Sequence, residues 1–225
     1  MNGTDKRTRR KERSIKRRLV YVGLFLACLI PLAAGVYRGT TLILEWDWAP
    51  VFLRDRVDNL PLFIHVTCAA VFYVLGAIQI LPSLRKRYPK WHRKAGKIAV
   101  IAGIAGAVSS TWLTVLHPDA RGPVLYYGRI VFGPLWTLFL VLGILAIRRR
   151  DFARHQDWMT RAFAVAMPAG TLIVLILPFY IVLGEVSDTL DESIQSGAWV
   201  LHLSIAEYLI RRRRSKKRRT LQGEQ

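Results

Sequence analysis

Long uncharged stretches separated by short charged segments form the pattern of this chain. Six such stretches, each 18 to 26 residues long, cover residues 19–37, 59–84, 98–118, 130–147, 162–184 and 193–210, the last interrupted only by Glu207. A bilayer core of about 30 Å needs roughly 20 apolar residues in a helix that rises about 1.5 Å per residue. Each stretch is therefore long enough to span a membrane.

The stretches predict helices because they lack the strict alternation of a membrane β-strand, which spans in only about 10 residues. Lipid also offers the backbone no hydrogen-bond partner, so an isolated spanning segment must satisfy its amides within a helix. The sequence therefore predicts an all-α, polytopic membrane bundle with six transmembrane helices over residues 19–211. A basic N-terminal segment, 1–18, precedes this domain, and a basic tail, 212–225, follows it.

Cationic residues are concentrated in alternate segments between the spans. The chain has 34 Lys and Arg against 15 Asp and Glu, and 29 of the 34 lie in segments 6–18, 85–97, 148–161 and 211–219. Lys and Arg accumulate on the cytoplasmic side of membrane proteins. This distribution predicts a multi-pass protein of the cell's inner (plasma) membrane with both termini in the cytoplasm.

The same charge predicts the partners of the protein. Each Lys or Arg near an anionic membrane surface gains about 1 kcal/mol, so the lipid bilayer and its anionic headgroups are expected partners. A nucleic-acid partner is not expected, because the cations are spread over every inner loop and no nucleic-acid-binding module is recognisable. Residues 19–37 could instead be a cleaved signal peptide with LAAG as its site, but their length favours a retained helix.

Two helix faces rich in small or polar residues stand out inside the predicted spans. The face in the second stretch has three- and four-residue steps and comprises His65, Cys68, Ala69, Phe72, Gly76 and Gln79. The stripe in the third repeats every seven residues and comprises Gly96, Gly103, Ser110 and His117. Such a stripe admits either a neighbouring helix or a flat ligand, and helix packing is the more frequent reason for it.

All five histidines lie in or beside the spans, where ionisable residues are candidate functional sites. His92 and His155 precede the third and fifth stretches, at the inner surface, whereas His65 and His117 lie toward the outer surface. His202 lies near mid-depth and could replace His117 as the partner of His65. Two layers of paired histidines are the arrangement that a protein with two haem b groups would use. The alternative for each histidine alone is a hydrogen-bonded structural residue.

Three segments resemble a family of bacterial predicted membrane proteins, domain of unknown function 2306. They are GAIQILPSLRKRYPKWHRKAGK (76–97), RHQDWMTRAFAV (154–165) and AEYLIRR near the end. The resemblance covers about residues 60–211 and implies a helical membrane fold, but no activity. The positions that match the family's motifs are Gln79, Arg85, His92, Arg93, Gly96, His155, Trp158, Met159, Arg161 and Glu207.

Three functions fit these features. The first is a haem b electron-transfer protein in which Arg93 and Arg161 pair with the propionates. The second is a binding or transport protein for an anionic lipid or small solute, held by the same arginines with Trp158 in the headgroup belt. The third is a scaffold in which Asp157 and nearby arginines tie the third and fifth helices together.

No catalytic residue is predicted, because no Ser-His-Asp order, phosphate loop or cysteine-rich metal motif is present. Two further polar residues lie within the predicted spans. Gln79 belongs to the face of the second stretch, and Glu207 can either pair with Arg211, one turn later, or extend toward the bundle interior. A proton or ion role for Glu207 is a further possibility.

Overall fold

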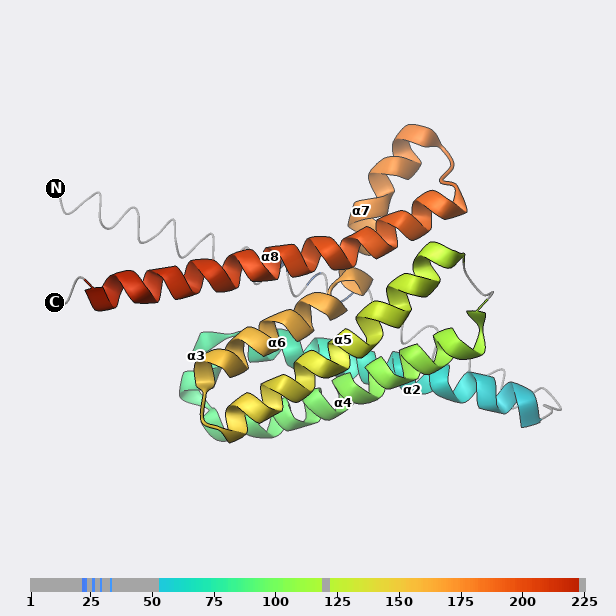
Figure 1. The fold of residues 1–225 in the computed structure, drawn as a ribbon. Helices are drawn as coiled ribbons and strands as arrows, with labels where there is room; N and C mark the ends of the chain where they lie inside the picture. The colour runs from blue at the N-terminus through green and yellow to red at the C-terminus, as the bar shows by residue number, and fades with distance from the viewer. Residues whose placement is uncertain are drawn as a thin grey trace.

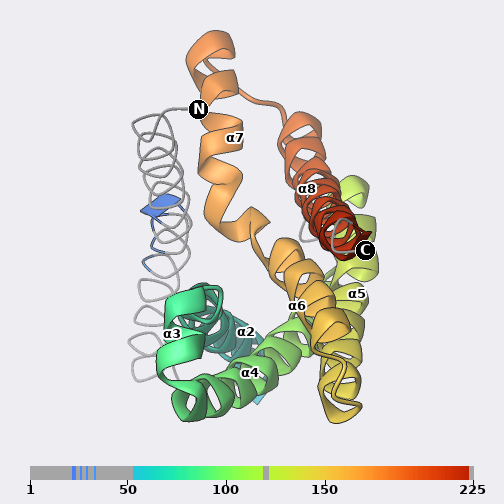
Figure 2. The same cartoon turned by 90° about the vertical axis from the view of Figure 1, so that its left-hand side faces the viewer.

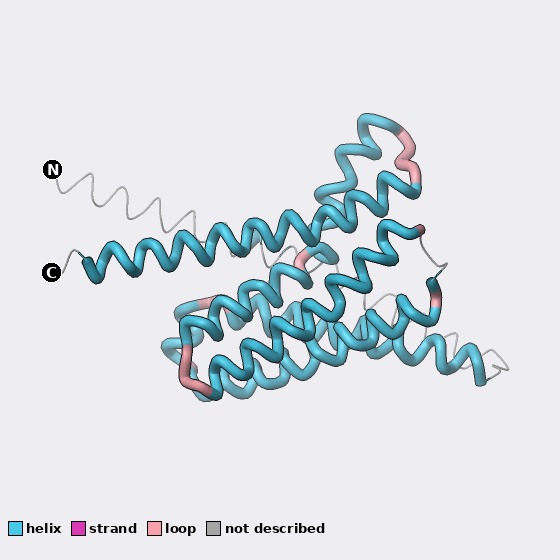
Figure 3. Tube along the Cα trace, in the orientation of Figure 1, coloured by secondary structure: helices cyan, strands magenta, loops and turns pink. Residues whose placement is uncertain are grey.

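Seven helices make up the part of the chain that the structure describes. This computed structural model describes residues 53–118 and 122–222, together with five positions between residues 22 and 33. The helices are α2 (Leu53–Gln79), α3 (Pro82–Arg87), α4 (Pro89–Leu116), α5 (Pro123–Arg148), α6 (Phe152–Ala166), α7 (Pro168–Leu183) and α8 (Asp188–Gln222). Short loops join them, and no strand occurs in these residues (Figure 3). The predicted all-α fold class is confirmed.

Proline opens four of these helices. Pro82, Pro89, Pro123 and Pro168 occupy the first turns of α3, α4, α5 and α7. The first turn tolerates proline because its amides have no acceptor within the helix, and the ring fixes a helical φ. α6 begins differently, with the Asp151 carboxylate accepting a hydrogen bond from the backbone N–H of Arg154 at 2.9 Å. Local sequence therefore sets where most of these helices begin.

The helices form one bundle (Figures 1 and 2). α4 packs against both α2 and α5, and α6 packs against the other side of α5. α8 lies across α5, α6 and α7, whereas α7 makes most of its contacts with α8. The short helix α3 lies at one end of the bundle, next to α2 and α4, and this end also holds the turn between α5 and α6 (Figure 1).

Three described helices are long and apolar enough to cross a membrane. They are the 60–79 part of α2, all of α4 and all of α5. The bent pair α6 and α7 is a fourth if it counts as one broken span. α8, which contains the predicted sixth span, is not among the described helices that qualify, and most of the predicted first span, 19–37, lies outside the described residues. The count of six spans and the cytoplasmic termini are thus not confirmed.

The predicted fifth span is not one straight helix. A single run over 162–184 was expected, but α6 begins earlier, at Phe152, and a bend of 46° separates it from α7 at Met167. Pro168 follows the bend directly. Because proline has no N–H and its ring clashes with the carbonyl four residues earlier, a straight α-helix cannot continue through it. At the other end of the chain, α8 remains helical to Gln222, through most of the predicted tail.

The predicted face of α2 packs against α4. A Cβ atom added to Gly103 of α4 would lie 2.7 Å from the Phe72 ring of α2 and 2.8 Å from Leu140 of α5. One turn further along α4, a Cβ on Gly106 would lie 3.6 Å from the Cβ of Cys68. The small residues of α4 therefore receive side chains from both neighbouring helices, which is the packing role of such a stripe.

Candidate functional site

His92 lies in the first turn of α4 and is half-buried. Its Nδ1 atom is buried and has no hydrogen-bond partner among the described residues. The ring is close enough to Arg85 of α3 and His155 of α6 to interact with both electrostatically. A buried polar atom without a partner costs about 1–3 kcal/mol. A ligand that bonded Nδ1 of His92 would remove that cost.

His155 reaches the same region from the first turn of α6. Its Nδ1 lies 2.9 Å from the backbone carbonyl oxygen of Gly143 on α5, so a proton on Nδ1 donates to that carbonyl. Gly143 has no side chain between the two helices, and a Cβ there would lie 2.0 Å from the methyl carbon of Met159. This bond fixes the tautomer that leaves Nε2 of His155 as an acceptor or metal ligand.

Gln79 connects the end of α2 to the start of α4. Its side-chain Nε2 donates a hydrogen bond to the backbone carbonyl of His92 at 3.0 Å. The amide group also covers Gly96, where an added Cβ would lie 3.7 Å from Gln79 Nε2. Gln79 therefore holds the backbone of His92, and within residues 53–118 and 122–222 it makes no hydrogen bond to His155.

Arg161 of α6 is already paired. Its Nε and one terminal nitrogen donate to the two carboxylate oxygens of Glu207 on α8, the latter at 3.0 Å. The guanidinium carbon also lies 4.5 Å from the centre of the Trp158 ring, which stacks on Phe139 of α5. Arg161 therefore contacts both Glu207 and Trp158. Pairing with Arg211 was one of two expectations for Glu207, and the structure pairs it with Arg161 of another helix.

Asp157 forms a second ionic contact between the same two helices. Its side chain is only 4% exposed and accepts hydrogen bonds from Arg213 and from Arg214, the latter at 2.6 Å and 2.9 Å. The scaffold alternative placed a tie between the third and fifth predicted helices here. The contact instead joins α6 to α8, which are the predicted fifth and sixth helices, because α8 covers this face of α6.

The outer histidines are not gathered in the predicted pairs. His65 Nδ1 lies 2.8 Å from the carbonyl oxygen of Gly106, whereas His117 follows Gly106 by eleven residues, or about 16 Å of helix. Both nitrogens of His202 are engaged, with the Ala198 carbonyl at 2.6 Å and the Thr171 hydroxyl at 3.1 Å. His65 and His202 thus serve contacts between or within helices, and His117 is exposed.

The model of one protein family, described as Predicted membrane protein (DUF2306), matches residues 62–210 of this chain. That match covers most of the protein and the whole of the bundle from α2 to the middle of α8. The chain belongs to the DUF2306 family. No curated protein and no solved structure matches the sequence. The family assignment agrees with the apolar helices, and this DUF2306 protein is a membrane protein with several candidate transmembrane helices.

The three sequence segments that resemble DUF2306 meet at one end of the bundle in this family member. Two contacts join the segments to one another: the Phe163 ring lies 2.9 Å from a Cβ added to Gly76, and Arg161 pairs with Glu207. The bond from Gln79 to the His92 backbone lies within the first segment, and the bond of His155 goes to Gly143, outside all three. Arg93 belongs to the same segments and is exposed beside His92. The segments therefore combine helix-to-helix ties with one pair of histidines whose ring nitrogens are not fully used by the protein.

Sequence reasoning missed two parts of this site. Gly143 lies in an uninterrupted apolar stretch, and nothing in the sequence marks it as the acceptor for His155. The pairing of Arg161 with Glu207 carries a better signal, since lone charges of opposite sign beside two apolar stretches are expected to find each other. Choosing between Arg211 and Arg161 required the helix arrangement.

Proposed function

We propose that this protein is a haem b-binding electron-transfer protein of the cell's inner (plasma) membrane, in which His92 and His155 would hold the haem iron. The observation that carries the proposal is the state of the ring nitrogens on two histidines of different helices, α4 and α6, that lie within electrostatic range of each other. One of them has a buried nitrogen without a partner, and the other is held by a glycine carbonyl that leaves its second nitrogen available.

The donor set suits haem better than a bare metal ion. No group of three or more His, Cys, Asp or Glu side chains converges as a candidate ion site within the described residues. Haem iron takes four nitrogens from the porphyrin and needs only one or two protein ligands, for which imidazole is common. Bound haem would supply one-electron transfer, while the protein supplies ligand position and polarity.

The remaining residues of this end have separate tasks under this proposal. Arg85 interacts with His92, and Arg93 is the exposed residue next to it, so these two cations are the candidates to pair with haem propionates. Arg161 is not counted among them, because two of its three guanidinium nitrogens already donate to Glu207. Gly143 orients His155, as a carbonyl behind a metal-binding histidine commonly does.

Spectroscopy of the purified full-length protein tests the proposal. After expression with a haem precursor, we expect a Soret band, which is lost or strongly reduced in His92→Ala and in His155→Ala. His117→Ala and His202→Ala are matched controls that should retain the band, since neither residue belongs to the pair. A wild-type protein that stays colourless and takes up no added haem, or equal loss of the band in all four variants, would reject the proposal.

A further inference from the structure

The exposed face of α4 changes from cationic to apolar within two turns. Lys90, Lys94 and Lys97 are exposed, and the exposed residues that follow are Ile98 and Ile101, which are 54% and 69% exposed. In a membrane protein, isoleucines that are this exposed on the bundle surface are suited to contact lipid, whereas lysines require water or headgroups. The boundary between headgroups and hydrocarbon is therefore expected near Lys97.

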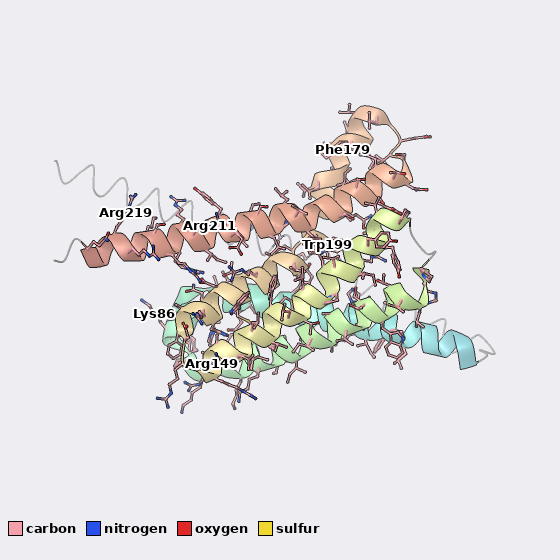
Figure 4. All side chains as sticks on the ribbon, viewed as in Figure 1. Lys86, Arg149, Phe179, Trp199, Arg211 and Arg219 are labelled. Atoms are coloured by element: carbon pink, nitrogen blue, oxygen red, sulfur yellow. The ribbon has the colours of Figure 1, made fainter. Side chains whose placement is uncertain are left out.

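Two more helices make the same change at the same end of the bundle. On α5 the exposed Ile147 is followed by Arg149, and on α8 the exposed Leu209 is followed by Arg211. Figure 4 shows Arg149 and Arg211 near the end of the bundle that carries Lys86 of α3. Three helices thus change from apolar to cationic surface in the same layer, which defines one side of the membrane.

Aromatic side chains accompany the cations in this layer. Tyr88, which connects α3 to α4, is 49% exposed, and Trp91, in the first turn of α4, is 39% exposed. The Arg87 guanidinium carbon lies 5.5 Å from the centre of the Tyr88 ring. Exposed Tyr and Trp are enriched at the headgroup level of membranes, where they have an apolar and a polar side to satisfy. They favour a bilayer over a soluble acidic partner.

The carboxylates that the structure describes at this end do not neutralise these cations. The carboxylates described at this end, on Asp151, Asp157 and Glu207, already pair with Arg154, with Arg213 and Arg214, and with Arg161. Eight exposed cations at this end form what we call the basic collar: Lys86, Arg87, Lys90, Lys94, Lys97, Arg148, Arg149 and Arg150. None of the eight pairs with a carboxylate within the described residues.

We infer that the basic collar binds the phosphate groups of anionic phospholipids. The inference does not depend on the haem proposal, because the collar contains neither histidine of the pair. The cations at the end of α8 are expected to contribute less. Figure 1 shows α8 continuing past α3 and the turn between α5 and α6, so Arg218 and Arg219 extend away from the layer in which the collar lies.

Native mass spectrometry of the full-length protein in detergent tests this, with added phosphatidylglycerol and phosphatidylcholine as probes. We expect phosphatidylglycerol to bind more tightly. One cation near an anionic surface contributes about 1 kcal/mol, which is about a fivefold change in Kd. The double variant Lys86→Gln/Lys90→Gln is therefore expected to raise the Kd for phosphatidylglycerol on the order of 20-fold. High salt should weaken wild-type binding in the same direction.

Matched variants separate the collar from general charge. Arg218→Gln/Arg219→Gln removes the same number of charges from the end of α8 and should change the Kd much less. Lys86→Arg/Lys90→Arg keeps the charge and should leave binding near the wild-type level. Equal binding of the two lipids by the wild-type protein overturns the inference. The inference is also overturned if the α8 variant loses as much affinity for phosphatidylglycerol as the collar variant does. It is likewise overturned if the collar variant keeps the wild-type Kd for phosphatidylglycerol but loses binding to polyglutamate, a soluble acidic polymer.

Discussion

The α2–α4 and α6–α8 contacts join pairs of helices in the same bundle with opposite kinds of side chain. Between α2 and α4, glycines receive apolar side chains, as where the Phe72 ring lies against Gly103. Between α6 and α8, each helix contributes both an acid and a base, so that Arg161 pairs with Glu207 and Asp157 pairs with arginines of α8. One contact depends on shape and the other on charge.

The difference follows from what surrounds each contact. Lipid is as apolar as leucine, so two spanning helices gain no hydrophobic free energy by associating and depend on close packing, which small residues allow. Charges can serve near the end of the bundle, where the arginines of α8 reach Asp157 while remaining 37% and 59% exposed. A charged contact is geometrically specific, so it fixes which helix lies against α6 and at what height.

Reversing one charge should have the largest effect on this comparison. Arg161→Glu places a second carboxylate against Glu207 and also removes the cation from the Trp158 ring. Breaking a buried ion pair costs about 3–5 kcal/mol, and partial exposure of Glu207 favours the lower end, about 3 kcal/mol. The measurement is the thermal unfolding midpoint in detergent, which should fall.

A charge swap supplies the control for that variant. Arg161→Glu/Glu207→Arg restores opposite charges and should recover part of the lost stability, but not all, because Trp158 no longer lies under an arginine of α6. Coupling between the two sites is then read from the double-mutant cycle. If the swapped protein is no more stable than Arg161→Glu alone, the pair contributes packing and not charge.

The contact between α2 and α4 should show the second largest effect. In Gly103→Ala, the new methyl group meets the Phe72 ring and Leu140 at distances of 2.7 and 2.8 Å, so at least one buried neighbour must move. Overpacking of this kind typically costs about 1–3 kcal/mol. Comparing the unfolding midpoint with that of Gly23→Ala, where nothing lies within 4 Å of the added Cβ, isolates the clash from helix propensity. An equal midpoint in both variants would contradict it.

The two contacts also differ in how far sequence could predict them. Steps of three and four residues along α2 predicted the face that packs against α4, because helical periodicity alone determines which residues share a face. The partner of Glu207 could not be chosen in this way. Arg211 is one turn away in sequence and Arg161 is 46 residues away, and only the placement of α8 against α6 decides between them.

The same limit applies to the histidines and to the spans. Apolar length predicted α4 and α5, and the proline that bends the fifth span was visible in the sequence, although its effect was not anticipated. Inner and outer layers of histidine followed from depth along each span. Depth does not tell which rings meet across the bundle. It left His65 with two candidate partners, His117 and His202, whereas the structure places Nδ1 of His65 2.8 Å from the Gly106 carbonyl oxygen.

The smallest expected effect is at Gly143 of α5, which faces α6 and, like Gly103, has a side chain of the neighbouring helix against it. In Gly143→Ala the new methyl group would lie 2.0 Å from the terminal carbon of Met159, closer than any contact at Gly103. Methionine has three rotatable bonds and moves easily, whereas the Phe72 ring is confined by Trp136 and Phe163. We therefore expect a cost below about 1 kcal/mol, less than at Gly103 despite the closer clash. The measurement is the thermal unfolding midpoint of the two variants side by side. A larger fall of the midpoint in Gly143→Ala than in Gly103→Ala would show that the distance of the clash, and not the flexibility of the neighbouring side chain, sets the loss of stability.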